Sequence, residues 1–146
     1  MAGPSPQSER SLEQIVLVSG EVGAAELSKF LRLQRPGLTV TPVTILADLV
    51  VLPRQLLSRA RLIAFASDIV VPKACLDALG FGAYNFHPGP PSHPGWAPAC
   101  FAIYDRAAIF GATAHLMTER VDDGPIVGTR LFPLPPDITV VEPLRQ

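Results

Sequence analysis

The chain has 146 residues and a net charge of −1, with 12 Lys and Arg against 13 Asp and Glu. This length predicts one domain with a single core, and 48% apolar residues are enough to fill that core. The near-neutral charge without a basic run argues against a nucleic-acid backbone as the main ligand. No apolar run reaches the roughly 18 residues needed to cross a membrane.

The two ends of the chain differ in composition from its middle. We expect residues 1–12 to be a mobile polar leader, 13–134 a single domain and 135–146 an irregular tail. The leader does not have the positive-then-apolar pattern of a signal peptide. The isolated Cys75 and Cys100 predict reduced thiols in a cytoplasmic protein rather than a disulfide framework or a metal site. The high apolar fraction is also compatible with a homo-oligomer.

Short apolar runs alternate with helical patterns along the chain, which predicts an α/β fold with a mainly parallel sheet. The predicted strands are residues 15–18, 39–46, 62–66, 83–86, 110–117 and 125–134. The predicted helices are residues 24–35, 53–60, 72–79 and 98–107. The first strand has no polar alternation, as expected of a strand that is buried on both faces. Pro42 predicts that the second strand lies at an edge of the sheet or is weakened.

The fourth predicted strand carries Asn85 and His87 at the point where it breaks into a loop rich in proline and glycine. Proline fixes φ and glycine permits positive φ, so the loop continues neither as strand nor as helix. Positions i and i+2 of an extended chain face the same side, so the amide and the imidazole point together. Ligands of open α/β sheets bind at the carboxyl ends of the strands. We therefore expect a site at this strand end.

A second polar stretch runs from Gly111 through His115 to Asp122-Asp123-Gly124-Pro125. The last four residues are typical of a turn between two strands. Taken alone, Asp122 is expected to cap its own turn. Beside Asn85 and His87, the same carboxylate is a candidate for orienting or charging an imidazole.

These stretches together resemble the formyltransferase family that uses 10-formyltetrahydrofolate. The resemblance covers residues 62–134 and rests on three motifs: Asn85-x-His87-Pro88, Gly111-x-Thr113-x-His115 and Val121-Asp122-x-Gly124-Pro125. The family includes glycinamide ribonucleotide, methionyl-tRNA and sugar N-formyltransferases, as well as formyltetrahydrofolate deformylase. The resemblance implies a Rossmann-like formyltransferase fold, a mainly parallel sheet flanked by helices, which is shortened here in its first half.

The resemblance also implies a catalytic trio of Asn85, His87 and Asp122. The trio would transfer a formyl group from 10-formyltetrahydrofolate to the amine of a small-molecule acceptor. An amide donates a hydrogen bond without titrating, and a protonated imidazole donates to the developing oxyanion. The carboxylate favours the charged imidazole or holds a water that relays a proton.

Further site residues follow from the same resemblance. The folate side is expected to comprise Asp68, Ile69, Val70, Val71, Thr118 and Val121. The acceptor side is expected to comprise Pro90, Trp96, Thr113 and His115. Thr113 and His115 retain the alternative of structural hydrogen bonding, and Trp96 that of packing its own loop. No Cys/His cluster has the spacing of a metal site.

Three functions stay open at the level of the sequence. The first is a formyltransferase that acts on a small amine. The second is a hydrolase (deformylase) that releases formate with water as the acceptor, and formate release without added amine separates it from the first. The third is a non-catalytic folate-binding module, which tight folate binding without turnover would indicate.

Overall fold

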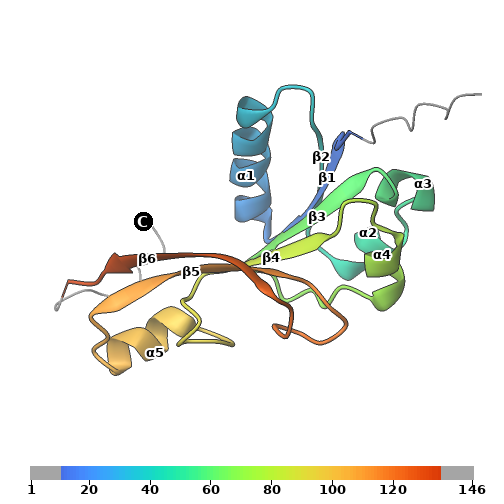
Figure 1. Cartoon of the computed structure of the whole chain (residues 1–146). Coiled ribbons are helices and arrows are strands. Elements are labelled where there is room, and N and C mark those ends of the chain that lie inside the picture. Colours follow the sequence, from blue (N-terminus) through green and yellow to red (C-terminus); the bar gives the residue numbers. More distant parts are fainter. Residues whose placement is uncertain (1–10, 136–146) are drawn as a thin grey trace, which may run out of the picture.

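The computed structural model describes residues 11–135, and their strands form one twisted sheet (Figure 1). The strands are β1 Gln14–Ser19, β2 Thr39–Val43, β3 Ala60–Phe65, β4 Ala83–His87, β5 Ile109–Leu116 and β6 Ile126–Pro133. The helices are α1 Glu21–Gln34, α2 Leu46–Val50, α3 Arg54–Leu57, α4 Lys73–Ala78 and α5 Pro98–Tyr104. Nearly all of the predicted leader and tail lies outside the described residues, so the division into leader, domain and tail stays a prediction.

The strand order in the sheet is β2-β1-β3-β4-β5-β6. Strands β1 to β4 run parallel, whereas β5 is antiparallel to β4 and β6 is antiparallel to β5. This topology confirms the α/β fold with a mainly parallel sheet. Pro42 lies in β2 at an edge of the sheet, where a residue without a backbone N–H is tolerated.

The parallel strands are covered on both faces. Val16 and Val18 of β1 pack in a cluster with side chains of α2, α3 and α4, whereas Ile15 and Leu17 pack in a second cluster with α1. Figure 1 shows α1 on one side of the sheet and the three short helices on the other. Because both faces need apolar side chains, the strand is a continuous apolar run.

The antiparallel end has a separate and thinner core. Phe110 of β5 packs with Ala99 and Ala102 of α5 and with Phe132 of β6. The two phenylalanine rings meet edge to face, with 6.0 Å between their centroids. Strands β5 and β6 together form an antiparallel ribbon, and Figure 1 shows α5 against one side of it. Seven of the eight residues of β6 are exposed.

Four predicted boundaries are wrong by three residues, and the first is the start of α1, which lies at Glu21 rather than at Ala24. The predicted strand 39–46 ends at Val43, and residues 46–50 form α2, which the sequence analysis did not predict. A short apolar run does not distinguish strand from helix, and the single turn of α2 buries Leu49 completely. Ala60 opens β3 rather than closing a helix, because it pairs with Gln14 of β1. The helix predicted over 98–107 ends at Tyr104.

Within residues 11–135, no helix is both long and apolar enough to cross a membrane.

Candidate active site

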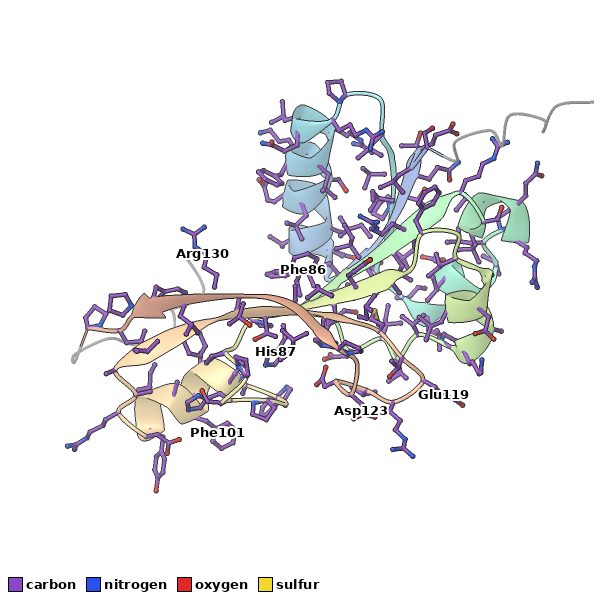
Figure 2. The ribbon with its side chains drawn as sticks, in the orientation of Figure 1. Phe86, His87, Phe101, Glu119, Asp123 and Arg130 are labelled. Atoms are coloured by element: carbon purple, nitrogen blue, oxygen red, sulfur yellow. The ribbon has the colours of Figure 1, made fainter. Side chains whose placement is uncertain are left out.

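The predicted site lies where the sheet changes from parallel to antiparallel. Strand β4 pairs with β3 on its parallel side and with β5 on its antiparallel side. Asn85 lies opposite His115, and His87 lies opposite Thr113. Directly opposed residues of an antiparallel pair share a face, so each pair projects to the same side. Figure 2 shows His87 on the side of the sheet that carries α5 and Phe86 on the other side.

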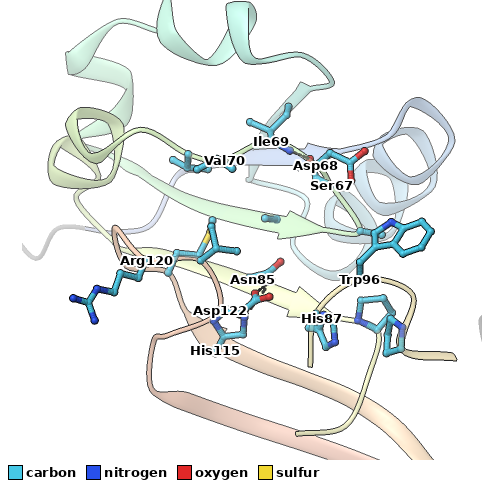
Figure 3. Close-up of a pocket in the computed structure, with 18 of the residues that line it drawn as sticks. Ser67, Asp68, Ile69, Val70, Asn85, His87, Trp96, His115, Arg120 and Asp122 are labelled. Carbon is cyan, nitrogen blue, oxygen red and sulfur yellow. Dashed lines mark hydrogen bonds and ion pairs between the residues drawn. The ribbon is translucent and has the colours of Figure 1, made fainter. Parts of the chain in front are cut away.

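Three polar side chains meet at this position (Figure 3). Asn85 Nδ2 lies 3.1 Å from His115 Nε2 and 3.4 Å from Asp122 Oδ1. His115 Nε2 also lies 3.3 Å from Asp122 Oδ1. His115 is buried, whereas the Asp122 side chain is 35% exposed. The carboxylate therefore forms the part of this network that is open to solvent.

The protonation of His115 follows from its second contact. Nδ1 lies 3.0 Å from the carbonyl oxygen of Leu116, which can only accept, so Nδ1 carries the proton. In the neutral ring Nε2 then accepts from the Asn85 amide. This orients the amide, since the reverse orientation would place Oδ1 of Asn85 against the carboxylate. A doubly protonated ring would instead donate from Nε2 to Asp122.

The Asp122 side chain is directed at the site from within the turn between β5 and β6. The residue lies in the turn with φ of 57°, in the left-handed region that Asp tolerates better than most residues. Its side chain reaches back to Asn85 and His115. Gly124 permits this turn, because a Cβ at that position would collide with the carbonyl oxygen of Leu116. The tight turn therefore places the carboxylate beside the β4 residues.

His87 is held by the loop that follows it. Its Nε2 lies 3.2 Å from the carbonyl oxygen of His93. The hydroxyl of Thr113 donates to the carbonyl oxygen of Gly89 at 2.8 Å, in a buried contact. A Cβ at Gly89 would come within 2.7 Å of His87 Nε2 and of Pro98. The loop therefore packs closely on the imidazole.

A cavity of about 660 Å³ opens beside these groups. Its walls are the segment after β3, the end of β4, the start of α5 and the turn between β5 and β6. All nine residues predicted as catalytic or folate-side line it: Asn85, His87, Asp122, Asp68, Ile69, Val70, Val71, Thr118 and Val121. Their functional roles stay predictions.

The predicted acceptor-side residues divide into two pairs. His115 and Trp96 line the cavity, and Trp96 is 86% exposed at its rim (Figure 3). Pro90 and Thr113 do not line it. Thr113 supports Gly89 through its hydroxyl, and the carbonyl oxygen of Pro90 accepts from the backbone N–H of His93 at 2.9 Å.

Several residues that line the cavity were not predicted from the sequence. Glu119 and Arg120 lie between the predicted Thr118 and Val121, so the continuity of that turn was an available signal. Residues 97–100 contribute the start of α5, and no sequence pattern indicated that this helix would lie against the cavity. In the part of the chain that the structure describes, no three His, Cys, Asp or Glu side chains gather as a metal site would require.

Known proteins resemble this chain in sequence and in fold. A family model described as formyl transferase matches residues 58–142. A methionyl-tRNA formyltransferase of Sorangium cellulosum (strain So ce56) is 35% identical over 74 residues, which are 50% of this chain and 24% of that relative. This chain thus spans about a quarter or less of the length of the curated relatives that it matches.

Two solved structures show the same fold at lower identity. Glycinamide ribonucleotide transformylase 1 from Symbiobacterium toebii gives a TM-score of 0.67 at 21% identity, over 94% of this chain and 81% of that one. HypX from Aquifex aeolicus in complex with tetrahydrofolic acid gives 0.70 at 23% identity, over 86% of this chain and 22% of HypX. These likenesses confirm the predicted Rossmann-like formyltransferase fold. Because the family model covers more than half of its residues, the chain belongs to the formyl transferase family.

Proposed function

We propose that this chain transfers a formyl group from 10-formyltetrahydrofolate to the amine of a small-molecule acceptor. The observation that carries the proposal is the network of Asn85, His115 and Asp122, which opens on the cavity at the end of β4. Family membership supports the reaction class. The likeness to a protein solved with tetrahydrofolic acid supports a folate as the formyl donor.

The cavity suits such a donor in size and in lining. Its volume of about 660 Å³ is typical of sites for small organic ligands. Val70 and Val121 line it while 61% and 66% exposed, so a flat heteroaromatic ring would cover apolar surface that now faces water. Asp68 adds an acceptor for the N–H groups along the edge of a pterin. When bound, the donor supplies a formyl carbon that an amine can attack.

Asn85 is suited to stabilise the negative oxygen that develops during transfer. One N–H of its amide is held by His115 at 3.1 Å, and the other makes a longer contact of 3.4 Å to Asp122. The longer contact lies outside the usual range of strong N–H···O bonds, so this N–H is the one available to an oxyanion in the cavity. His115 keeps the amide oriented meanwhile. A preorganised donor of this kind accelerates acyl transfer by about 100- to 1,000-fold.

Asp122 is suited to take up the proton that the attacking amine must lose. Its carboxylate is partly exposed at the cavity, so it can accept that proton directly or through one water. His87 lines the same cavity from the end of β4. Its Nε2 is engaged by the loop, which leaves Nδ1 for a bound substrate.

The test is to incubate the purified chain with 10-formyltetrahydrofolate, with and without a panel of small amines, and to quantify tetrahydrofolate and formate. Asp122→Asn is expected to retain the fold and lose about 100- to 1,000-fold in rate. The matched control is Asp123→Asn, which removes the adjacent exposed carboxylate and should leave the rate nearly unchanged. His87→Ala is expected to lower the rate much more than the thermal stability.

The outcomes separate the functions that were open at the start. Tetrahydrofolate formed only with an amine supports the transferase. Equal formate release with and without amine identifies a hydrolase instead. Binding of 5-formyltetrahydrofolate without turnover identifies a folate-binding module, and near wild-type turnover by Asp122→Asn contradicts the role of this carboxylate.

A further inference from the structure

We propose that His93 and Asp105 are positioning residues for His87. Together they anchor the loop carbonyl that keeps the imidazole proton on Nε2 and leaves Nδ1 open for a substrate. The catalytic consequence rests on the proposed function, whereas the tautomer itself is a property of the free protein.

The tautomer follows from one contact. His87 Nε2 lies 3.2 Å from the backbone oxygen of His93, and a carbonyl oxygen has no proton to give. The nitrogen must therefore be the donor. Among residues 11–135, no hydrogen-bond partner is present for His87 Nδ1. The neutral ring thus has its proton directed at the loop and its lone pair on the unengaged nitrogen.

The loop needs a side-chain anchor because its backbone has few donors. Four of the residues between His87 and Trp96 are prolines, at positions 88, 90, 91 and 94. Proline has no backbone N–H, so a ladder of backbone hydrogen bonds cannot hold this segment. The backbone N–H of His93 donates to Pro90 within the loop, which shapes a turn but ties it to nothing outside.

The His93 side chain supplies a second external anchor, in addition to the hydrogen bond from Thr113 to Gly89. It is 14% exposed, and its Nε2 lies 3.5 Å from Asp105 Oδ2. Its Nδ1 lies 3.1 Å from Ser92 Oγ. When the serine hydroxyl donates to Nδ1, the ring proton lies on Nε2 and faces the carboxylate.

Asp105 connects this anchor to the core. It follows α5 directly, and its backbone N–H donates to the carbonyl oxygen of Phe101 at 2.9 Å. Helix α5 packs through Ala99 and Ala102 against Phe110 of β5. The position of the His93 carbonyl is thus set by packing on the antiparallel ribbon.

The tautomer of His87 determines which role its ring can take at the start of the reaction. With the proton on Nε2, the free lone pair on Nδ1 can accept a hydrogen bond from the attacking amine, whose proton Asp122 takes up. The ring can donate from Nδ1 only after it has gained a second proton. The loop therefore favours a His87 ring whose Nδ1 first accepts a hydrogen bond and can donate one only later.

The experiment is ¹⁵N-histidine NMR of the free chain, which identifies the protonated ring nitrogen and measures how fast its proton exchanges with water. We expect the proton of His87 on Nε2. In His93→Ala its exchange should be roughly two- to tenfold faster, the range for loss of a hydrogen bond of ordinary net strength. Asp105→Ala should have a smaller effect in the same direction, and Asp105→Asn, which keeps an acceptor oxygen, should restore most of the protection.

Asp77→Ala is the matched control, because it removes an equally exposed carboxylate that pairs with Lys73 on α4. It should leave the exchange rate unchanged. A proton on Nδ1 in the wild type, or equal exchange in all variants, would overturn the proposal. If His93→Ala does not fold, Asp105→Ala decides, since its side chain is 58% exposed and its loss should leave the fold intact. These readouts need no turnover, so an inactive chain would count against the proposed function alone.

Discussion

The two halves of the sheet are built differently. The four parallel strands lie between α1 and the helices α2 to α4, and their side chains form two buried clusters. The two antiparallel strands have α5 on one side, a smaller cluster around Phe110, and an edge strand that is mostly exposed. The first half is thus a three-layer structure, and the second is a two-stranded ribbon that packs on a single helix.

The site draws on both halves. Asn85 and His87 lie on β4, which is anchored by the parallel half through β3. His115 comes from β5 and Asp122 from the turn before β6. The parallel half therefore fixes the position of the amide and the imidazole. The ribbon brings the groups that orient them, and it carries the loop anchor through α5.

The largest expected effect comes from a core leucine of the parallel half. Leu62 is fully buried in β3, so Leu62→Ala should lower the free energy of unfolding by about 2–5 kcal/mol. Leu131→Ala in β6 is the matched change in the ribbon, where the side chain is 55% exposed, and should cost less than about 1 kcal/mol. Urea unfolding of both variants measures the difference. Equal losses would mean that the ribbon carries as much of the stability as the parallel half.

The same contrast explains what the sequence could predict. Buried parallel strands are continuous apolar runs, so β1 and β3 were found from residues such as Ile15 and Leu62 with errors of one or two residues. Helix α2 was missed because its first residue, Leu46, was assigned to the end of the preceding strand and the next four residues are too few to show a helical period. Its helical state depends on tertiary packing of Leu49, which no local pattern encodes.

For the site, the sequence indicated which residues line the cavity but not which of them contact one another, since Asn85 and Asp122 meet His115 rather than His87. Two-residue alternation placed Asn85 and His87 on one face, and the resemblance added Asp122. The contact of Asn85 with His115 depends on the β4–β5 register, and that of His87 with His93 depends on a loop without regular structure. For Thr113 the sequence left the acceptor side and structural hydrogen bonding open, and its hydroxyl donates to the carbonyl oxygen of Gly89. Such details require the strand pairing, which sequence spacing does not specify.

A medium effect is expected at the seam between the two halves. Thr113→Val conserves shape but removes the hydroxyl that donates to the buried carbonyl oxygen of Gly89. An unsatisfied buried carbonyl costs about 1–3 kcal/mol, so the free energy of unfolding should fall by that amount. The cross-strand partner provides the control, since Thr129 is exposed and Thr129→Val should have almost no effect. If both variants behave alike in urea unfolding, the Thr113 hydroxyl does not support the loop.

The smallest effect concerns the two thiols, one in each half. Burial among the side chains around α4 raises the pKa of the Cys75 thiol above its ordinary value of 9.0, whereas Cys100 on α5 is exposed. Below that value both folded and unfolded chains keep Cys75 protonated. As the pH rises past 9.0, the unfolded chain loses the proton first, so the free energy of unfolding should decline.

Urea unfolding of the wild type, of Cys75→Ala and of the control Cys100→Ala across this pH range isolates the effect of the buried thiol. Cys75→Ala should flatten the decline, because burial in the three-layer half raises the pKa of that thiol. An equal flattening by Cys100→Ala would contradict the difference in burial between the two thiols.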